Sequence, residues 1–282
     1  MTVYPLTFSL LGFQVTGFGI LMMLAFLVAG WVMQLELQRR RLNPEFSADI
    51  VVAGVVGGIL GARVWYVALH GGPLFSRAGL VWYGGFLGGV AAVMAMSWWK
   101  RVPIRFTFEL TAPALALGHG LGRVGCFLVQ DDYGLPTALP WGMKFPEGQP
   151  PTTAAALARW GVEVPAGTLP NTVLAVHPTQ LYEVAALLFS FWLLWRLRRH
   201  GHAVGWLFGV YLVVIGVERF LVEFLRAKDD RLLGTLTLAQ VTSLVLLAVG
   251  VGLMTRLRRA DGFTVEPKAG LAAKPIAPPR AG

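Results

Sequence analysis

The chain has 282 residues, 55% of them hydrophobic and only 14% charged, with a formal net charge of +9 at pH 7. Soluble domains usually carry about 25% charged residues, so this composition indicates an integral membrane protein. The basic residues form short clusters between apolar blocks, a pattern typical of loops between membrane spans, and this argues against nucleic acid as a partner. The single cysteine excludes a disulfide framework and any Cys-rich zinc or iron–sulfur site.

Seven apolar runs are long enough to cross about 30 Å of hydrocarbon. They cover roughly residues 12–34, 50–69, 79–99, 107–128, 180–195, 203–225 and 237–255. The sequence therefore predicts an all-α polytopic membrane protein with seven transmembrane helices. Closely spaced glycines in the second, third and fourth runs favour close contact between helices in lipid.

Four basic clusters indicate how the predicted helices are oriented. They are Arg39–Arg41, Lys100–Arg105, Arg196–Arg199 and Arg256–Arg259, and they follow the first, third, fifth and seventh runs. With seven spans, all four clusters fall on one side, so the positive-inside rule predicts an N-terminus outside and a C-terminus in the cytoplasm. The N-terminus has no basic segment and no cleavage site of small residues, so we interpret the first run as an uncleaved span.

The longest connection lies between the fourth and fifth runs, at about residues 129–178. A loop of this length is usually functional or mobile. Its Pro, Trp and Gly content, as in "LPWGMKFPEG", favours a small ordered cap outside the membrane over a solvated linker. We therefore expect one transmembrane domain over residues 1–259 with this external cap. The Pro-, Ala- and Lys-rich end predicts a disordered basic cytoplasmic tail over residues 260–282.

The fourth run carries polar residues that are costly in a bilayer. His119, Arg123 and Cys126 are spaced i, i+4 and i+7, so they share one face of a helix. An arginine at the centre of a membrane helix costs roughly 2.5–3.5 kcal/mol on insertion scales, so Arg123 is expected to face the bundle interior or a watery cavity. The alternative is an interfacial arginine whose side chain reaches to the headgroups.

The sixth run repeats this spacing with Arg219, Glu223 and Arg226. Two arginines and one carboxylate leave a surplus positive charge. Together with Arg123 and Arg63, they predict a cationic pocket for a phosphate diester, because guanidinium groups pair with phosphate oxygens in a bidentate manner. The alternative is that Glu223 only neutralises an arginine so that the helix can insert.

A third motif, "HPTQLYE", begins the fifth run. Pro and Thr suit the start of a helix, but this does not explain His177, Gln180, Tyr182 and Glu183 together. A histidine at a helix start is more often structural than a base. No i, i+4 pair of histidines and no His-Glu-x-x-His pattern occurs, so no metal is expected. No Gly-x-Ser-x-Gly elbow, P-loop or Rossmann fingerprint stands in the required context.

The motifs "GRVGCFLVQDDYG", "HPTQLYE" and "ERFLVEFLR", in this order, resemble those of bacterial phosphatidylglycerol:prolipoprotein diacylglyceryl transferases. The resemblance covers about residues 12–255. It implies a multi-pass enzyme of the inner membrane that needs no cofactor. Its substrates would be phosphatidylglycerol and the lipobox segment of a prolipoprotein, and it would transfer the diacylglyceryl group to the lipobox thiol and release glycerol phosphate.

The resemblance also implies roles for individual residues. Arg123 corresponds to the arginine that holds the lipid phosphate, Arg219 to a second essential arginine, Glu223 to its acidic companion and Gly134 to the glycine that ends the first motif. A thiol is mostly protonated at neutral pH, so some group or field must favour the thiolate while cations stabilise the departing phosphate.

Four positions depart from the family pattern. Phe18 replaces a tyrosine, Tyr83 a histidine often proposed as the base, Cys126 an asparagine and Asp131 a glutamate. The base therefore stays open between Tyr83 at the histidine position, His119 as a replacement, and the arginine field alone. Cys126 is better explained as a small buried side chain than as a nucleophile, because displacing a lipid from a thioether is chemically hard.

Two other functions are compatible with these residues. The first is a family member that binds phosphatidylglycerol but uses another acceptor or is inactive, which the four departures would favour. The second is a phospholipid transporter or scramblase, for which polar residues inside the bundle are also expected. Transporters often contain internal inverted repeats, and the two halves of this sequence show no convincing repeat.

Overall fold

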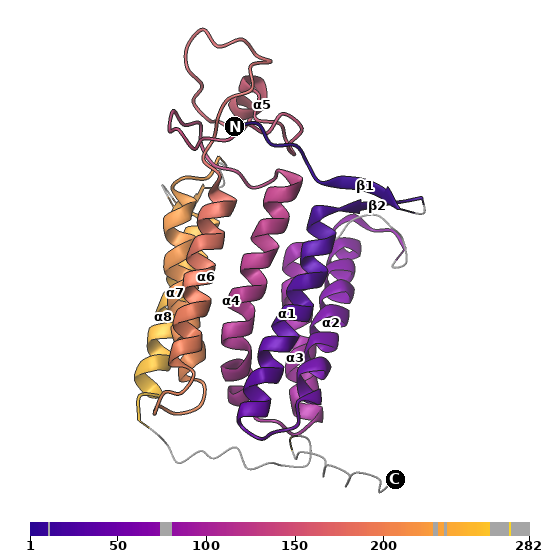
Figure 1. Ribbon diagram of the computed structural model, residues 1–282, viewed down its shortest axis with the longest axis vertical. Helices are drawn as coiled ribbons and strands as arrows, with labels where there is room; N and C mark the ends of the chain where they lie inside the picture. The colour runs from indigo at the N-terminus through magenta and orange to yellow at the C-terminus, as the bar shows by residue number, and fades with distance from the viewer. Residues whose placement is uncertain (11, 74–80, 228–230, 234–235, 260–270, 272–282) are drawn as a thin grey trace, which may run out of the picture.

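The protein forms an elongated bundle of roughly parallel helices in the computed structural model (Figure 1). The structure describes residues 1–10, 12–73, 81–227, 231–233, 236–259 and 271. The long helices are α1 (Gly17–Arg39), α2 (Glu45–His70), α3 (Trp82–Trp99), α4 (Ile104–Val129), α6 (Thr179–Leu197), α7 (Trp206–Glu223) and α8 (Leu238–Arg256). In the described residues, helices α1, α2, α4 and α8 are long and apolar enough to cross a membrane, so the chain is a polytopic membrane protein of the helical class.

Two short hairpins and one short helix complete the described elements. Strands β1 (Thr7–Leu10) and β2 (Phe13–Thr16) pair antiparallel, as do β3 (Arg231–Leu233) and β4 (Leu236–Thr237), and α5 spans Ala154–Arg159. The predicted first span begins too early, at residue 12. Residues 13–16 form a strand instead, and the helix begins after Thr16, whose hydroxyl accepts a hydrogen bond from the Gly19 amide at 3.2 Å.

Helix α4 lies at the centre of the bundle, with α1 packed on one side and α6 and α7 on the other (Figure 1). The helices α2 and α3 form a tight pair beside α1. A Cβ atom added to Gly61 would lie 2.3 Å from the carbonyl oxygen of Gly84, and one added to Gly84 would lie 2.4 Å from that of Gly61. The expected close contact between small residues is therefore present, and only glycine permits it at these two positions.

The chain between α4 and α6 builds a cap over one end of the bundle, which we call the cap end (Figure 1). The cap has a buried cluster of its own that includes Tyr133, Phe145, Leu157 and Val176. The N-terminal segment joins it, since the Gln130 side chain donates to the carbonyl of residue 3 at 2.6 Å. The rim of the bundle at this end is thus held to the cap by hydrogen bonds and apolar packing.

The opposite end, where loops join α1 to α2, α3 to α4 and α6 to α7, is called the basal end. Its apolar core includes Leu37, Phe46, Phe106 and Leu110. Leu271 is buried in the same core, at 1% exposure, and its carbonyl accepts a hydrogen bond from the amide of residue 43. The rest of the predicted disordered tail, residues 260–270 and 272–282, lies outside the described residues.

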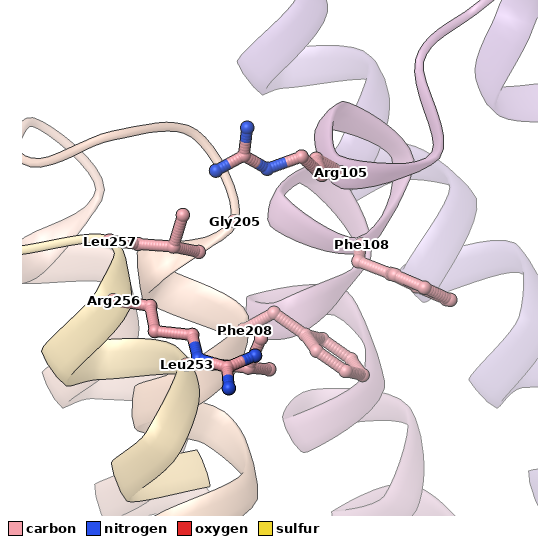
Figure 2. Close-up of a pocket in the computed structure, with 7 residues that line it drawn as sticks. All are labelled: Arg105, Phe108, Gly205, Phe208, Leu253, Arg256 and Leu257. Atoms are coloured by element: carbon pink, nitrogen blue, oxygen red, sulfur yellow. The ribbon is translucent and has the colours of Figure 1, made fainter. Parts of the chain in front are cut away.

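A pocket of about 200 Å³ opens at the basal end between α4, α7 and α8. Figure 2 shows Arg105 and Phe108 from α4 and Arg256 from α8 among the side chains that line it. None of the residues singled out from the sequence as a candidate for chemistry lines this pocket. The candidate site must therefore be sought elsewhere, at the cap end.

Candidate active site

The three sequence motifs meet at the cap end, where α4, α6 and α7 leave or enter the bundle. The amide of Gly134 donates to the carbonyl of His177 at 2.8 Å, and the next amide, that of Leu135, donates to the carbonyl of Leu225 at 2.7 Å. The first motif is thus hydrogen-bonded to the second and the third by two consecutive residues.

Gly134 lies where the three motifs meet, and we call this position the joint of the site. A Cβ atom at this position would lie 2.5 Å from the carbonyl oxygen of Leu225 and 2.8 Å from the Cβ of His177. Both distances are too short for a real side chain, because the two atoms are already fixed by backbone hydrogen bonds. The glycine is therefore required by the close approach of three chain segments.

The same contact brings three arginines and three carboxylates into a closed ring, which we call the ion-pair ring. In order around the ring, its members are Arg123, Asp132, Arg226, Glu223, Arg219 and Glu183, and the last closes on the first. Cations and anions alternate at every step. The ring contains residues of all three motifs.

Among the described residues, the ring is hydrogen-bonded at Asp132, which binds two of its arginines. Arg123 lies 2.8 Å from Asp132, whose other oxygen contacts Arg226, and Arg219 lies 2.6 Å from Glu223. The contacts of Glu183, at 3.0 Å from Arg123 and 3.7 Å from Arg219, lack hydrogen-bond geometry, and so do those of the Glu223 Oε2 atom. The ring is therefore strongly bonded on one side and weakly on the other.

Burial also differs from one member of the ring to the next. The side chain of Glu183 is 1% exposed, whereas that of Asp132 is 38% exposed and that of Arg219 is 23% exposed. Several buried atoms of the ring, among them both oxygens of Glu183 and one nitrogen of each arginine, have no hydrogen-bond partner among the described residues. Buried polar atoms are nearly always paired in folded proteins, so this concentration at one place makes the ring the candidate functional site.

The charge of the ring differs from the sequence-based expectation. That expectation counted one carboxylate against several arginines and predicted a surplus positive charge. In the structure Asp132 and Glu183 join Glu223, so three guanidinium groups face three carboxylates. A phosphate that pairs with these arginines must therefore compete with the carboxylates of the ring.

Asp132 is a ring residue that the sequence reasoning missed. The resemblance pointed to Asp131, but Asp132 makes both ion pairs, and neither oxygen of Asp131 is part of the ring. Burial opposes ionisation of Asp132, but the charges of Arg226 and Arg123 outweigh it and hold the pKa of this carboxyl below its usual range. Burial, followed by the charge of Asp132, raises the pKa of Asp131. The only sequence signal was the doubled aspartate.

Glu218 is a second missed residue, next to Arg219 on α7. It is 6% exposed, and neither of its carboxylate oxygens has a hydrogen-bond partner among the described residues. It interacts electrostatically with Glu183 and with all three ring arginines, so it lies beside the ring. The signal in the sequence was a charged residue inside an apolar run.

Residues of the "HPTQLYE" motif contact both the ion-pair ring and the cap. Glu183 belongs to the ring, and the Gln180 amide donates to the carbonyl of Asp131 at 2.5 Å. His177 contacts the Tyr182 hydroxyl at 3.2 Å, and that hydroxyl accepts from Trp141 of the cap at 2.7 Å. The structural alternative considered for His177 therefore fits its contacts, which tie α6 to the cap.

Two further residues on α4 lie beside the ion-pair ring, and a residue of α1 packs against the same helix. His119 interacts electrostatically with Arg123 and Arg219, and the sulfur of Cys126 lies 3.9 Å from Arg123. Phe18 packs against the backbone of this helix, since a Cβ atom added at residue 125 would lie 3.2 Å from its ring. Of the four departures from the family pattern, Cys126 thus lies beside the ion-pair ring, and Phe18 packs against the residue before it.

Arg63 and Tyr83 are not among the residues that form the ring. Arg63 on α2 donates to the carbonyl of Pro73 and lies over the ring of Tyr66. Tyr83 near the start of α3 is 48% exposed and stacks edge-on against Trp82. Within the described part of the chain, no ion pair or hydrogen bond links either residue to the three motifs.

A possible metal site was tested on the same geometry. The sulfur of Cys126 and carboxylate oxygens of Asp131 and Asp132 lie within 4.8 Å of one another. Asp132 already holds two guanidinium groups, from Arg123 and Arg226, and positive charge at this distance disfavours a bound cation. The expectation of no metal therefore stays a prediction with this support.

Comparison with known proteins points to one family. The family model described as "Prolipoprotein diacylglyceryl transferase" matches residues 5–256. The chain is 30% identical over 291 residues to the phosphatidylglycerol–prolipoprotein diacylglyceryl transferase of Pseudoalteromonas atlantica, with 96% of this chain and 95% of the relative covered. It is 29% identical over 256 residues to that of Clostridium tetani (88% and 95% covered) and 32% identical over 246 residues to that of Thermosynechococcus vestitus (83% and 85% covered). The chain thus belongs to the prolipoprotein diacylglyceryl transferase family of membrane enzymes.

Proposed function

We propose that this protein transfers the diacylglyceryl group of phosphatidylglycerol to the thiol of the lipobox cysteine of a prolipoprotein and releases glycerol phosphate. The observation that carries the proposal is the ion-pair ring, in which three arginines from the first and third motifs alternate with carboxylates from all three motifs. Its arginines would hold the lipid phosphate, because the planar guanidinium group matches the geometry of phosphate oxygens.

The exposure of the ring suggests how the phosphate enters. Asp132 is the most exposed carboxylate of the ring, at 38%, and it bridges Arg123 and Arg226 with its two oxygens. A phosphate diester presents a similar pair of oxygens. We therefore expect the lipid phosphate to compete with Asp132 for these arginines.

The reaction forms a carbon–sulfur bond and breaks a carbon–oxygen bond. The thiolate of the lipobox cysteine attacks the glycerol carbon that carries the phosphate, and the electron pair of the broken bond stays on the phosphate. Negative charge accumulates on that oxygen, so cations already fixed in position lower the barrier. Arg123, Arg219 and Arg226 are the groups that would provide this stabilisation.

The membrane arrangement is part of the same proposal. The basic clusters that follow α1, α3, α6 and α8 lie at the basal end, opposite the cap. Under the positive-inside rule this supports a cytoplasmic basal end, a cap outside the inner membrane and seven spans. The ring would then lie near the outer leaflet, within reach of both a lipid headgroup and an exported precursor.

The test uses the purified protein in phosphatidylglycerol liposomes with a lipobox peptide. Release of glycerol phosphate and a diacylglyceryl mass increment on the peptide are expected from the wild type, and both should be lost in Arg123→Ala. The matched control is Arg159→Ala, which removes an exposed arginine of α5 outside the ring and should retain the activity. Absence of the mass increment with the wild-type protein would contradict the proposal.

A second candidate function is a family member that binds phosphatidylglycerol but uses another acceptor or is inactive. The observation that favours it is the position of two departures from the family pattern, Cys126 beside the ring and Phe18 against the same helix. Phosphatidylglycerol binding that depends on Arg123, without transfer to the lipobox peptide, would support this alternative over the first.

A further inference from the structure

The reaction needs a group that takes the proton of the thiol, and the ring does not provide an obvious one. The three carboxylates of the ring are engaged by arginines. His119 lies beside Arg123 and Arg219, and Tyr83 makes no described contact with the motifs. A group that is close to the ring and not engaged by it is therefore of special interest.

Glu218 has these properties. It is 6% exposed, both of its oxygens lack hydrogen-bond partners, and it forms no ion pair among the described residues. A buried carboxylate without a hydrogen-bond partner is costly, and taking up a proton lowers that cost. Such a group is either neutral for structural reasons or used to accept a proton.

Burial also distinguishes Glu218 from His119. A carboxylate becomes neutral when it accepts a proton, whereas an imidazole becomes charged. An apolar surrounding favours the neutral product, and the two arginines beside His119 further oppose a third positive charge there. Burial therefore favours proton uptake by Glu218 over proton uptake by His119, whereas the ring arginines that lie near both residues oppose it in each.

Building on the proposed transferase function, we propose that Glu218 is the general base that accepts the proton of the lipobox thiol. The S–H bond breaks as the proton moves to Glu218, and the sulfur then forms its bond to the glycerol carbon. The carbon–oxygen bond to the phosphate breaks, and its electron pair stays on the leaving glycerol phosphate. Glu218 returns the proton to that phosphate and is ready for the next cycle.

This assignment explains how the family's histidine position can carry Tyr83. In this chain the proton acceptor would lie on α7, one residue before Arg219, so the thiolate would form beside the cations that stabilise the leaving group. The base and the phosphate site would then be held by the same helix.

The experiment compares Glu218→Gln with the wild type on two peptides that differ in one atom. The first has the lipobox cysteine, and the second has selenocysteine, whose selenol is more acidic and is already ionised at neutral pH. With the thiol peptide the variant should lose about 10²–10⁴-fold in rate, the usual contribution of general base catalysis. With the selenol peptide the loss should be much smaller, because no base is needed.

The ratio of the selenol rate to the thiol rate is independent of how much of the variant is folded. A large rise of this ratio in Glu218→Gln, with none in the exposed cap variant Glu163→Gln, is the expected result. An unchanged ratio, or a wild-type rate with the thiol peptide, would overturn the role of Glu218. Failure of the wild-type protein to modify either peptide would instead contradict the proposed function itself.

Discussion

The two ends of the bundle both bury charged clusters, but they satisfy them in opposite ways. At the basal end Glu36 and Glu109 are 2% and 3% exposed, and both oxygens of each accept hydrogen bonds. At the cap end Glu183 and Glu218 are equally buried, and none of their oxygens has a hydrogen-bond partner among the described residues.

The basal cluster shows what buried charge looks like when it only stabilises a fold. Glu36 binds two arginines of its own helix, with Arg39 at 2.8 Å and Arg40 at 2.6 Å. Glu109 accepts from the amides of Gly205 and Leu207 at 2.9 and 3.1 Å, and so satisfies the first turn of α7. The ion-pair ring lacks this saturation, which is the physical reason to assign the chemistry to the cap end.

The largest effect is expected from breaking the basal cluster. Glu109→Ala leaves two amides at the start of α7 and His200 without their acceptor. Removing one partner of a buried charge pair costs about 3–5 kcal/mol. Unfolding of the variant in mixed micelles should show this loss, while transfer per folded molecule stays near that of the wild type. Glu147→Ala, on the exposed cap surface, is the control that should not shift unfolding.

Arg219→Lys should have the reverse effect, with a loss of transfer activity and little loss of stability. Lysine keeps the charge but cannot make the planar bidentate contact with a phosphate, so we expect a transfer rate lower by about 10²–10³-fold. Thermal unfolding should change little, because the weak side of the ring has few hydrogen bonds to lose. The assay is peptide modification in liposomes, with Arg159→Lys as the matched control. Equal losses of stability and activity would remove the distinction between the two ends.

Gly134→Ala tests the joint that assembles the ring. The added methyl group would overlap the carbonyl of Leu225, at 2.5 Å, and force apart the three motifs. Overpacking of this kind costs about 1–3 kcal/mol, and the transfer rate should fall with it. The control is Gly122→Ala in α4, where an added Cβ atom has nothing within 4 Å. The two variants are compared by unfolding and by transfer rate, and similar behaviour would contradict the role of the joint.

The smallest effect concerns the exposed side of the ring. The pKa of Asp132 is lowered in the folded protein, so its stabilising contribution is present above its unfolded pKa and is lost as the pH falls through its folded pKa. The difference in unfolding free energy between wild type and Asp132→Asn should therefore be positive at neutral pH and vanish in acid. We expect less than about 1 kcal/mol, because the side chain is partly exposed and such pairs are screened.

Asp131→Asn sharpens this test because the pKa of Asp131 is shifted in the opposite direction to that of Asp132. The pKa of Asp131 is raised by burial and by the charge of Asp132, so its effect on stability becomes less favourable as the pH rises. The two neighbouring aspartates should thus show opposite pH trends when unfolding is measured in the same buffers. The same trend in both variants would contradict one of the two pKa shifts.

Much of the architecture is predictable from the sequence. The long apolar runs predict the helices within a few residues, because burial in lipid demands continuous apolar stretches, and the family follows from three motifs in order. The start of α1 was misplaced because residues 13–16 are apolar enough to resemble a helix and form a strand instead. Hydrophobicity alone does not distinguish these two local structures.

Tertiary structure decided which of the charged residues act together. The spacing of Arg219, Glu223 and Arg226 on one helix predicts that they share a face, but the ring also needs Asp132 and Glu183 from other segments. Their contribution changes the expected surplus of positive charge into a balanced set. Pairing between distant segments depends on how α4, α6 and α7 pack, and no local pattern specifies it.

The sequence by itself thus determined the membrane environment, the helices and the family, because each of these depends on composition and on short-range spacing. Only the tertiary structure separated the saturated charges of the basal end from the unsaturated charges of the cap end, and only it brought Glu218 beside the arginines. The reason is physical: whether a buried charge is stabilised or left available depends on the donors around it, and these come from helices that are far apart in the chain.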